Sequence, residues 1–317
     1  MRVIDIVLPV YNEEAGIELF HRELTAVLET LADRYTFRLI YVLDRSSDDT
    51  FGVLTRLARA SDHVRIVHLA RRFGHQASLM AGLDHASGDA VIMMDSDLQH
   101  PPRLIPEFLA RFEAGYDVVQ AVRRYGHDVG VVRRQLSALF YRLQNALSPV
   151  EIASGAADFR LVSRRVVRVF QEGLREQSPF LRGLFQWVGF NRTEVPFVSA
   201  ERAAGVTKYR WRTLLTFSIV GIVSFSKVPL RLAALLGFGV SIMGIAYAVW
   251  LLWAYVVRGG FPPGFASLIL VTLVIGGLQL MFLGILGEYV GSVFDEVKRR
   301  PLYIVDEIVG GEARDRR

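Results

Sequence analysis

The stretch MMDSDLQHPP, residues 93–102, follows directly from the apolar run Ala90–Met94. An apolar run of this length that stops at a Pro-Pro pair predicts a buried strand ending in a loop. The loop carries Asp95 and Asp97, and in an open parallel sheet ligands bind beyond the carboxyl ends of the strands. Two adjacent carboxylates repel each other unless a cation lies between them, and oxygen ligands suit Mg²⁺ or Mn²⁺, which in turn bind a diphosphate. The alternative is a helix N-cap, because Asp ahead of proline and a helix is common.

The rest of residues 1–122 alternates between strand and helix patterns. The expected strands are Asp5–Val10, Phe37–Leu43, Val64–Leu69, Ala90–Met94 and Tyr116–Val122, and the expected helices between them are Glu13–Asp33, Asp49–Ala60 and Gln76–Ala86. This alternation predicts an α/β fold, with a mostly parallel sheet and helices on both faces.

The composition excludes several kinds of chemistry. The 317 residues contain no Cys, which rules out disulfides, Cys-ligated zinc and thiol catalysis. The 37 Lys and Arg residues exceed the 32 Asp and Glu residues by five, an excess too small to indicate nucleic acid, and we expect no such partner. No secretory signal opens the sequence, so the N-terminal part is expected in the cytosol.

The C-terminal part contains two long uncharged runs, Leu232–Val257 and Gly259–Gly287. Each exceeds the roughly 20 residues that a helix needs to cross a bilayer. We therefore expect two transmembrane helices within 231–287, rather than a buried helical hairpin, with a short extracytoplasmic loop near 258–264. Lys and Arg residues flank both runs, which places both ends in the cytosol by the positive-inside rule.

This pattern divides the chain into four parts. Residues 1–210 form a cytosolic domain, 211–230 a juxtamembrane interfacial helix, 231–287 the two spans, and 288–317 a juxtamembrane helix and tail. Two helices make a poor bundle by themselves, so a homo-oligomer in contact with membrane lipids is expected.

Polar clusters follow the first three strands as well as the fourth. Pro9, Tyr11 and Glu13 follow the first, where Glu13 has the alternative role of a helix-dipole carboxylate. Asp44 follows the second, where it could hold a ribose or a base edge, and Arg71–Gln76 follow the third. Carboxyl ends of parallel strands meet at one edge, so these clusters indicate one site.

These motifs, in this order, resemble glycosyltransferase family 2, whose members have the Rossmann-like GT-A fold and bind nucleotide sugars. The segments Asp158–Arg160, Glu201–Tyr209, Gly287–Tyr289 and Lys298–Tyr303, together with the two spans, narrow the resemblance to the polyprenyl-phosphate glycosyltransferases. That branch includes bactoprenol glucosyltransferases and dolichol-phosphate mannose synthases. The resemblance covers nearly the whole chain.

The resemblance implies roles for individual residues. The nucleotide-sugar pocket would be lined by Pro9, Tyr11, Glu13, Asp44, Asp95 and Ser96, and Mg²⁺ or Mn²⁺ would be held by Asp95, Asp97 and Gln99. The acceptor phosphate would face Arg123, Arg133, Arg202 and Lys208. The catalytic residues would be Asp97 and Asp158.

The resemblance also implies the reaction, which is the inverting transfer of a hexose to a polyprenyl phosphate. Glucose from UDP-glucose, undecaprenyl phosphate and the cytosolic face of a bacterial inner membrane are the expected donor, acceptor and location. The product would serve modification of cell-envelope glycans such as lipopolysaccharide. The alternatives are GDP-mannose or a UDP-aminoarabinose derivative as donor, or a non-catalytic membrane scaffold that keeps the fold.

The sequence departs from the family pattern where the nucleotide is read. The second cluster usually reads Asp-Asp-Gly-Ser, but here Leu43 and Arg45 stand at its first and third positions. Arg72 replaces the Asn of the third cluster, and Thr207 stands where Ser is usual.

Overall fold

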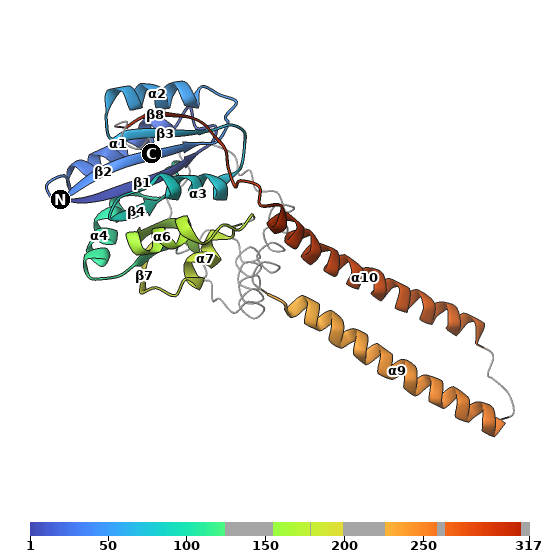
Figure 1. Ribbon diagram of the computed structural model, residues 1–317. Coiled ribbons are helices and arrows are strands. Elements are labelled where there is room, and N and C mark those ends of the chain that lie inside the picture. Colours follow the sequence, from blue (N-terminus) through green and yellow to red (C-terminus); the bar gives the residue numbers. More distant parts are fainter. Residues whose placement is uncertain (124–154, 178, 199–225, 259–263, 312–317) are drawn as a thin grey trace.

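The computed structural model describes residues 1–123, 155–177, 179–198, 226–258 and 264–311 (Figure 1). Its elements are β1 (Arg2–Val10), α1 (Ile17–Glu29), β2 (Tyr35–Leu43), α2 (Thr50–Ala60), β3 (Val64–Leu69), α3 (His75–His85), β4 (Ala90–Met93), the 3₁₀ turn η1 (Pro102–Leu104), α4 (Ile105–Glu113), β5 (Val118–Arg123), β6 (Ala156–Ser163), α6 (Arg164–Glu172), α7 (Leu181–Trp187), β7 (Arg192–Phe197), α9 (Val228–Arg258), α10 (Phe265–Lys298) and β8 (Val305–Gly310).

One sheet with the strand order β7-β5-β6-β4-β1-β2-β3-β8 organises the N-terminal domain. Strands β1 to β4 pair in parallel, while β6 runs antiparallel between β4 and β5 and β8 runs antiparallel along β3. The predicted α/β fold with a mostly parallel sheet is confirmed. The sequence did not predict β6, β7 or β8. Strand β6 carries Asp158 beside β4, and β8 places the C-terminal segment along β3.

Helices cover both faces of the sheet, as predicted. The alternation of side chains along β1 explains the two cores, because successive residues point to opposite faces. Ile4, Ile6 and Leu8 pack in the core beneath α1, α2 and α4. Val7 packs in the second core, beneath α3, α6 and α7. The site therefore lies at an edge supported on both sides.

Helix α3 packs very closely on β1, and Gly82 makes this approach possible. A Cβ atom at Gly82 would clash with the Val7 side chain, which is fully buried. We expect Gly82→Ala to destabilise the domain by about 1–3 kcal/mol, the typical cost of overpacking a core. Thermal unfolding in detergent measures the loss.

Gly52→Ala is the matched control for that prediction. Gly52 also lies in a helix, α2, but the atoms nearest to its added Cβ belong to the side chain of Asp49, which is exposed and can move aside. We expect no loss of stability, because Ala is favoured over Gly in helices by roughly 1 kcal/mol. An equal melting temperature for Gly82→Ala and wild type would contradict the close packing.

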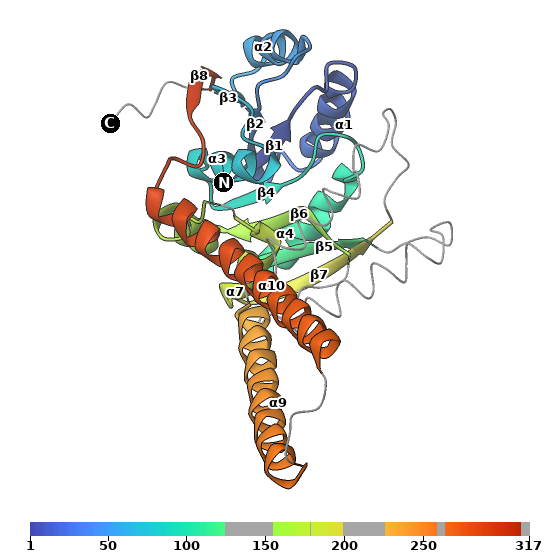
Figure 2. The ribbon, with the colours of Figure 1, turned by 90° about the vertical axis from the view of Figure 1, so that its right-hand side faces the viewer.

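Helices α9 and α10 project away from the sheet (Figures 1 and 2). In the described part of the chain, Val228–Val257 and Val274–Lys298 are long and apolar enough to cross a membrane by length and composition, with mean hydropathies of 2.1 and 1.5. Large apolar side chains are exposed along both helices. The predicted boundaries differ in detail, because α9 already begins at residue 228 and α10 runs unbroken through 288 to Lys298.

The C-terminal segment returns to the sheet. The sequence indicated only a juxtamembrane helix and tail for 288–317, but residues 305–310 form β8 on the free edge of β3. An interfacial helix was expected over 211–230. Residues 211–225 lie outside the described part of the chain, and residues 228–230 are the start of α9.

Candidate active site

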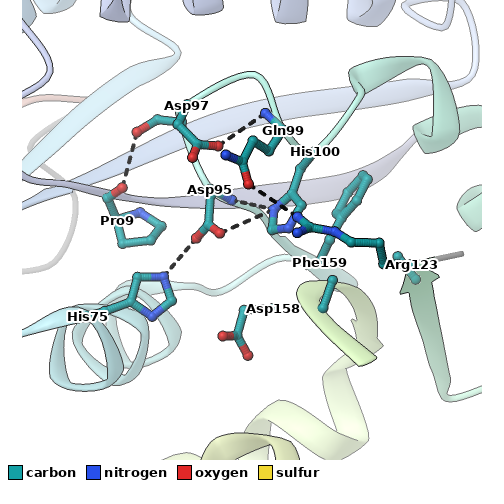
Figure 3. A network of polar contacts seen from close by, with 12 residues as sticks. Pro9, His75, Asp95, Asp97, Gln99, His100, Arg123, Asp158 and Phe159 are labelled. Carbon is teal, nitrogen blue, oxygen red and sulfur yellow. Dashed lines mark hydrogen bonds and ion pairs between the residues drawn. The ribbon is translucent and has the colours of Figure 1, made fainter. Parts of the chain in front are cut away.

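The loop after β4 folds tightly around its own polar groups (Figure 3). The Gln99 backbone N–H donates to Asp97 Oδ1 at 3.1 Å, and the Ser96 hydroxyl donates to the Pro9 carbonyl at 3.2 Å. Neither aspartate caps a helix: Pro101 precedes η1, Leu104 precedes α4, and neither helix start has a side-chain cap. The N-cap interpretation is therefore wrong, and both carboxylates face the edge of the sheet.

Two histidines flank Asp95 (Figure 3). His75 Nε2 lies 2.7 Å from Asp95 Oδ1, and His100 Nδ1 accepts the Asp95 backbone N–H at 2.9 Å. Burial raises the pKa of Asp95, but His100 and His75 stabilise the carboxylate and bring its pKa below the ordinary value. Burial lowers the pKa of His75, but Asp95 and then Asp158 outweigh it and raise the pKa to about 8.

His100 is a structural partner of the loop. It is 2% exposed and stacks on Phe159 at 5.2 Å between ring centroids. Burial lowers its pKa, and its Nδ1 accepts the Asp95 backbone N–H. This hydrogen bond fixes the direction of the Asp95 backbone.

Strand β6 brings Asp158 to the same edge. Met93 pairs with Arg160 in the antiparallel β4–β6 ladder, so two residues further along each strand Asp95 and Asp158 fall opposite each other. In Figure 3 the Asp158 carboxylate lies beside His75 and Asp95. The register, and not sequence spacing, makes these residues neighbours.

Two arginines hold Asp158. Arg160 donates to Oδ1 at 2.9 Å, and Arg182 in α7 donates to both oxygens at 3.1 and 2.8 Å. Burial raises the pKa of Asp158, but Arg182 and Arg160 outweigh it and hold the pKa well below its usual range. A carboxylate in this state is a poor proton acceptor, so Asp158 suits charge stabilisation better than general-base work.

Arg123 links β5 to the loop. Its guanidinium donates to Gln99 Oε1 at 3.2 Å and lies 5.9 Å from the Phe197 ring centroid. Of the four cations expected to face an acceptor phosphate, Arg133, Arg202 and Lys208 lie outside the described residues. Of these four cations, Arg123 is the one that the described part of the chain contains, and it lies at the site.

Hydrogen bonds join the polar cluster that follows β1 to the one that follows β2. The Glu13 N–H donates to the Thr50 hydroxyl at 3.0 Å, and Asn12 exchanges two hydrogen bonds with Ser47. The Asp44 oxygens each accept a backbone N–H, from Phe73 and Gly74, at 2.8 Å. Asp44 was expected to face a nucleotide; in the structure it is 3% exposed and holds the turn that leads into α3.

Of the residues that depart from the family pattern, Leu43, Arg45 and Arg72 have separate structural roles, and Thr207 lies outside the described residues. Leu43 is fully buried at the end of β2. The Arg45 guanidinium turns outward, 3.5 Å from the Ala70 carbonyl and 3.8 Å from Asp306 in β8. The Arg72 guanidinium lies 4.2 Å from the ring centroid of Tyr11. Arg72 therefore contacts Tyr11, a residue predicted for the nucleotide pocket.

The sequence singled out no role for four residues of this network: His75, His100, Arg160 and Arg182. His75, His100 and Arg160 stand inside or beside motifs already quoted, so proximity to those motifs was a usable signal. Arg182 lies 24 residues beyond Asp158, in a separate helix, and no local pattern marks it.

The oxygen donors of the loop fit a divalent cation. Asp95 and Asp97 supply carboxylates, Gln99 an amide oxygen, and such ligands suit Mg²⁺ and Mn²⁺. A carboxylate cluster of this kind beyond parallel strands, with arginines beside it, has the groups to bind a divalent cation and an anionic phosphate ester.

Comparison with known proteins identifies the family. The family described as Glycosyl transferase family 2 matches residues 5–170. The chain is 39% identical over 307 residues to the uncharacterized glycosyltransferase YkcC of Bacillus subtilis (strain 168), covering 97% of this chain and 94% of that protein. It is 38% identical over 302 residues to the SfII prophage-derived bactoprenol glucosyl transferase of Shigella flexneri, covering 95% and 97%.

Solved structures show a more distant similarity. Glucosyl-3-phosphoglycerate synthase from Mycobacterium tuberculosis, in complex with Mn²⁺, UDP-glucose and phosphoglyceric acid, is 25% identical with a TM-score of 0.44, over 70% of this chain and 78% of that chain. The family match and the full-length relatives establish that this chain belongs to glycosyltransferase family 2. It is a glycosyltransferase related to the bactoprenol glucosyltransferases.

Proposed function

We propose that this enzyme transfers a hexose, glucose from UDP-glucose, to undecaprenyl or another polyprenyl phosphate. The observation that carries the proposal is the Asp95–Asp97–Asp158 cluster with its arginines, in a chain whose C-terminal part has two helices of membrane-spanning length. A lipid acceptor requires a site at the membrane surface, and 38% identity over 302 residues to a bactoprenol glucosyl transferase supports this acceptor.

Each side chain has a distinct part in the proposed reaction. Asp95, Asp97 and Gln99 would hold Mg²⁺ or Mn²⁺, which stabilises the leaving nucleoside diphosphate when bound. An acceptor phosphate oxygen attacks the anomeric carbon, a new carbon–oxygen bond forms, and the bond to the diphosphate breaks with inversion. The acceptor is already anionic and needs no strong base, so Asp158 stabilises positive charge that develops at the sugar ring.

Cations would bring the two anionic substrates together. Arg123 at the described edge, with Arg133, Arg202 and Lys208, would neutralise the acceptor phosphate as it approaches the diphosphate. Pro9, Tyr11, Glu13, Asp44 and Ser96 would line the nucleotide-sugar pocket.

We also propose where the chain lies in the cell. Residues 1–210 would face the cytosol at a bacterial inner membrane, the two helices within 231–287 would span it, and 288–317 would return to the cytosolic side. The chain would act as a homo-oligomer and supply a lipid-linked sugar for modification of cell-envelope glycans such as lipopolysaccharide.

A donor panel tests the substrate assignment. The full chain is reconstituted in vesicles with undecaprenyl phosphate and given radiolabelled UDP-glucose, GDP-mannose or a UDP-aminoarabinose derivative. We expect label in the lipid fraction from UDP-glucose, loss of transfer with EDTA, and recovery with excess Mn²⁺ or Mg²⁺. Label from GDP-mannose alone would overturn the glucose assignment, and metal-independent transfer would overturn the metal assignment.

A further inference from the structure

The C-terminal end of α10 is joined to the sheet by a short connection. The helix ends at Lys298, Arg299 adopts a left-handed conformation with φ 47°, and β8 begins at Val305. Six residues span at most about 20 Å, so the end of the helix has little freedom relative to the sheet. Any further contact at this end adds to the positioning of the domain on its helices.

Gln177 makes two such contacts. Its backbone N–H donates to Glu296 Oε1 at 2.7 Å, and its side-chain amide donates to the Arg300 carbonyl at 2.7 Å. One residue of the N-terminal domain therefore holds the last turn of α10 and the chain just beyond it. The second bond is to the carbonyl of Arg300, two residues beyond the end of the helix.

Gln177 lies four residues ahead of α7, which carries part of the active site. At the start of α7 the Leu181 N–H donates to Gln76 Oε1 at 3.2 Å, and the next residue, Arg182, holds Asp158. Gln76 follows His75, the partner of Asp95. The segment that is bound to α10 therefore leads into α7, which contacts Asp158 through Arg182 and the residue next to His75 through Leu181.

A second tie holds the same connection to α3. The Tyr303 hydroxyl donates to Asp84 Oδ2 at 2.6 Å, and Arg175 holds both Asp84 oxygens at 2.7 and 2.8 Å. Burial and the Asp84 hydrogen bond raise the pKa of Tyr303, so the hydroxyl keeps its proton and donates. With α3 fixed by this tie, the Gln177 contacts fix the α7 side of the site.

We propose that Gln177 is a positioning residue for sugar transfer, which sets the location of Arg182 and Asp158 relative to the end of α10. The inference rests on the proposed lipid acceptor. The bilayer fixes the depth of the lipid phosphate, while the protein fixes the donor sugar. The reacting atoms must approach within about 3–3.5 Å, and a misplacement of about 1 Å can cost about 10²-fold in rate.

The test uses Gln177→Leu, Glu296→Ala and Glu296→Gln in the full chain, reconstituted in vesicles with undecaprenyl phosphate. We expect Gln177→Leu and Glu296→Ala each to lower kcat for lipid glycosylation about tenfold, with the KM for the donor and the Kd for UDP unchanged. Glu296→Gln keeps an oxygen that accepts the Gln177 N–H, so it should restore wild-type transfer. Each single variant keeps one of the two hydrogen bonds, so the double variant should lose more than either single variant.

Donor hydrolysis in vesicles without the lipid separates positioning from folding. Gln177→Leu should hydrolyse the donor at the wild-type rate, because the donor site is intact. Arg56→Leu, which removes an exposed ion pair to Glu18 on distant helices, is the control and should change nothing. Wild-type lipid transfer by Gln177→Leu, or a parallel loss of hydrolysis and donor binding, would overturn the inference. Absence of lipid transfer by the wild type would instead overturn the proposed function.

Discussion

Asp97→Asn is expected to lower kcat for sugar transfer by about 10³-fold while leaving the fold intact. A cation that stabilises the leaving diphosphate contributes several kcal/mol, and each ~1.4 kcal/mol is a factor of ten in rate. Asn keeps an oxygen for the Gln99 N–H, which is 3.1 Å from Asp97 Oδ1, so the loop retains its conformation. Steady-state transfer assays measure the loss of kcat. Titration with Mn²⁺ by calorimetry measures the metal affinity, which should fall as well.

Asp62→Asn is the matched control for the charge change. Asp62 is exposed between α2 and β3, away from the loop after β4, and its substitution should leave kcat and Mn²⁺ affinity unchanged. A variant Asp97→Asn with normal Mn²⁺ affinity and normal transfer would show that this carboxylate is not a metal ligand.

Asp158→Ala is expected to destabilise the domain and abolish transfer together. Arg160 is fully buried, and among the described residues its Nε and Nη1 atoms have no hydrogen-bond partner, so it depends on Asp158 for charge compensation. Removing one member of a buried ion pair costs about 3–5 kcal/mol. Thermal unfolding should show a melting temperature lower by roughly 10 °C for a domain of about 200 residues.

Asp158→Asn separates charge from shape. It keeps an acceptor for the Arg160 and Arg182 donors, so we expect a smaller loss of stability and a loss of transfer of about 10²-fold. Glu18→Gln, at an exposed ion pair with Arg56, should leave the melting temperature unchanged. Wild-type transfer by Asp158→Asn would exclude a role for its negative charge at the sugar.

The low pKa of Asp158 also determines how the difference in stability between wild type and Asp158→Asn depends on pH. A carboxylate whose pKa is lower in the folded than in the unfolded protein contributes stability above its unfolded pKa of about 4. That contribution disappears as the pH falls through the lower, folded pKa. The stability gap between wild type and Asp158→Asn should therefore be constant between about pH 5 and 6 and shrink below about pH 4. A gap that stays the same below pH 4 would contradict the low pKa of Asp158.

The departures from the family pattern show the limit of local inference. From the sequence alone, Leu43, Arg45 and Arg72 could be described only as replacements of the family's usual residues in a predicted nucleotide site. In the structure, Leu43 is core, Arg45 points toward β8, and Arg72 stacks on Tyr11. Their environments come from strands and loops far away in the chain, which no motif records.

The sequence by itself determined the layered α/β fold, the two apolar C-terminal helices and the loop that carries Asp95 and Asp97. These follow from local periodicity, because a strand or an amphipathic helix is encoded in neighbouring residues. The tertiary structure alone decided that Asp158 stands opposite Asp95 and that Arg182 holds it. It also decided that the chain after α10 returns as β8. Those contacts depend on strand register and helix packing between distant segments, which are set by the whole core.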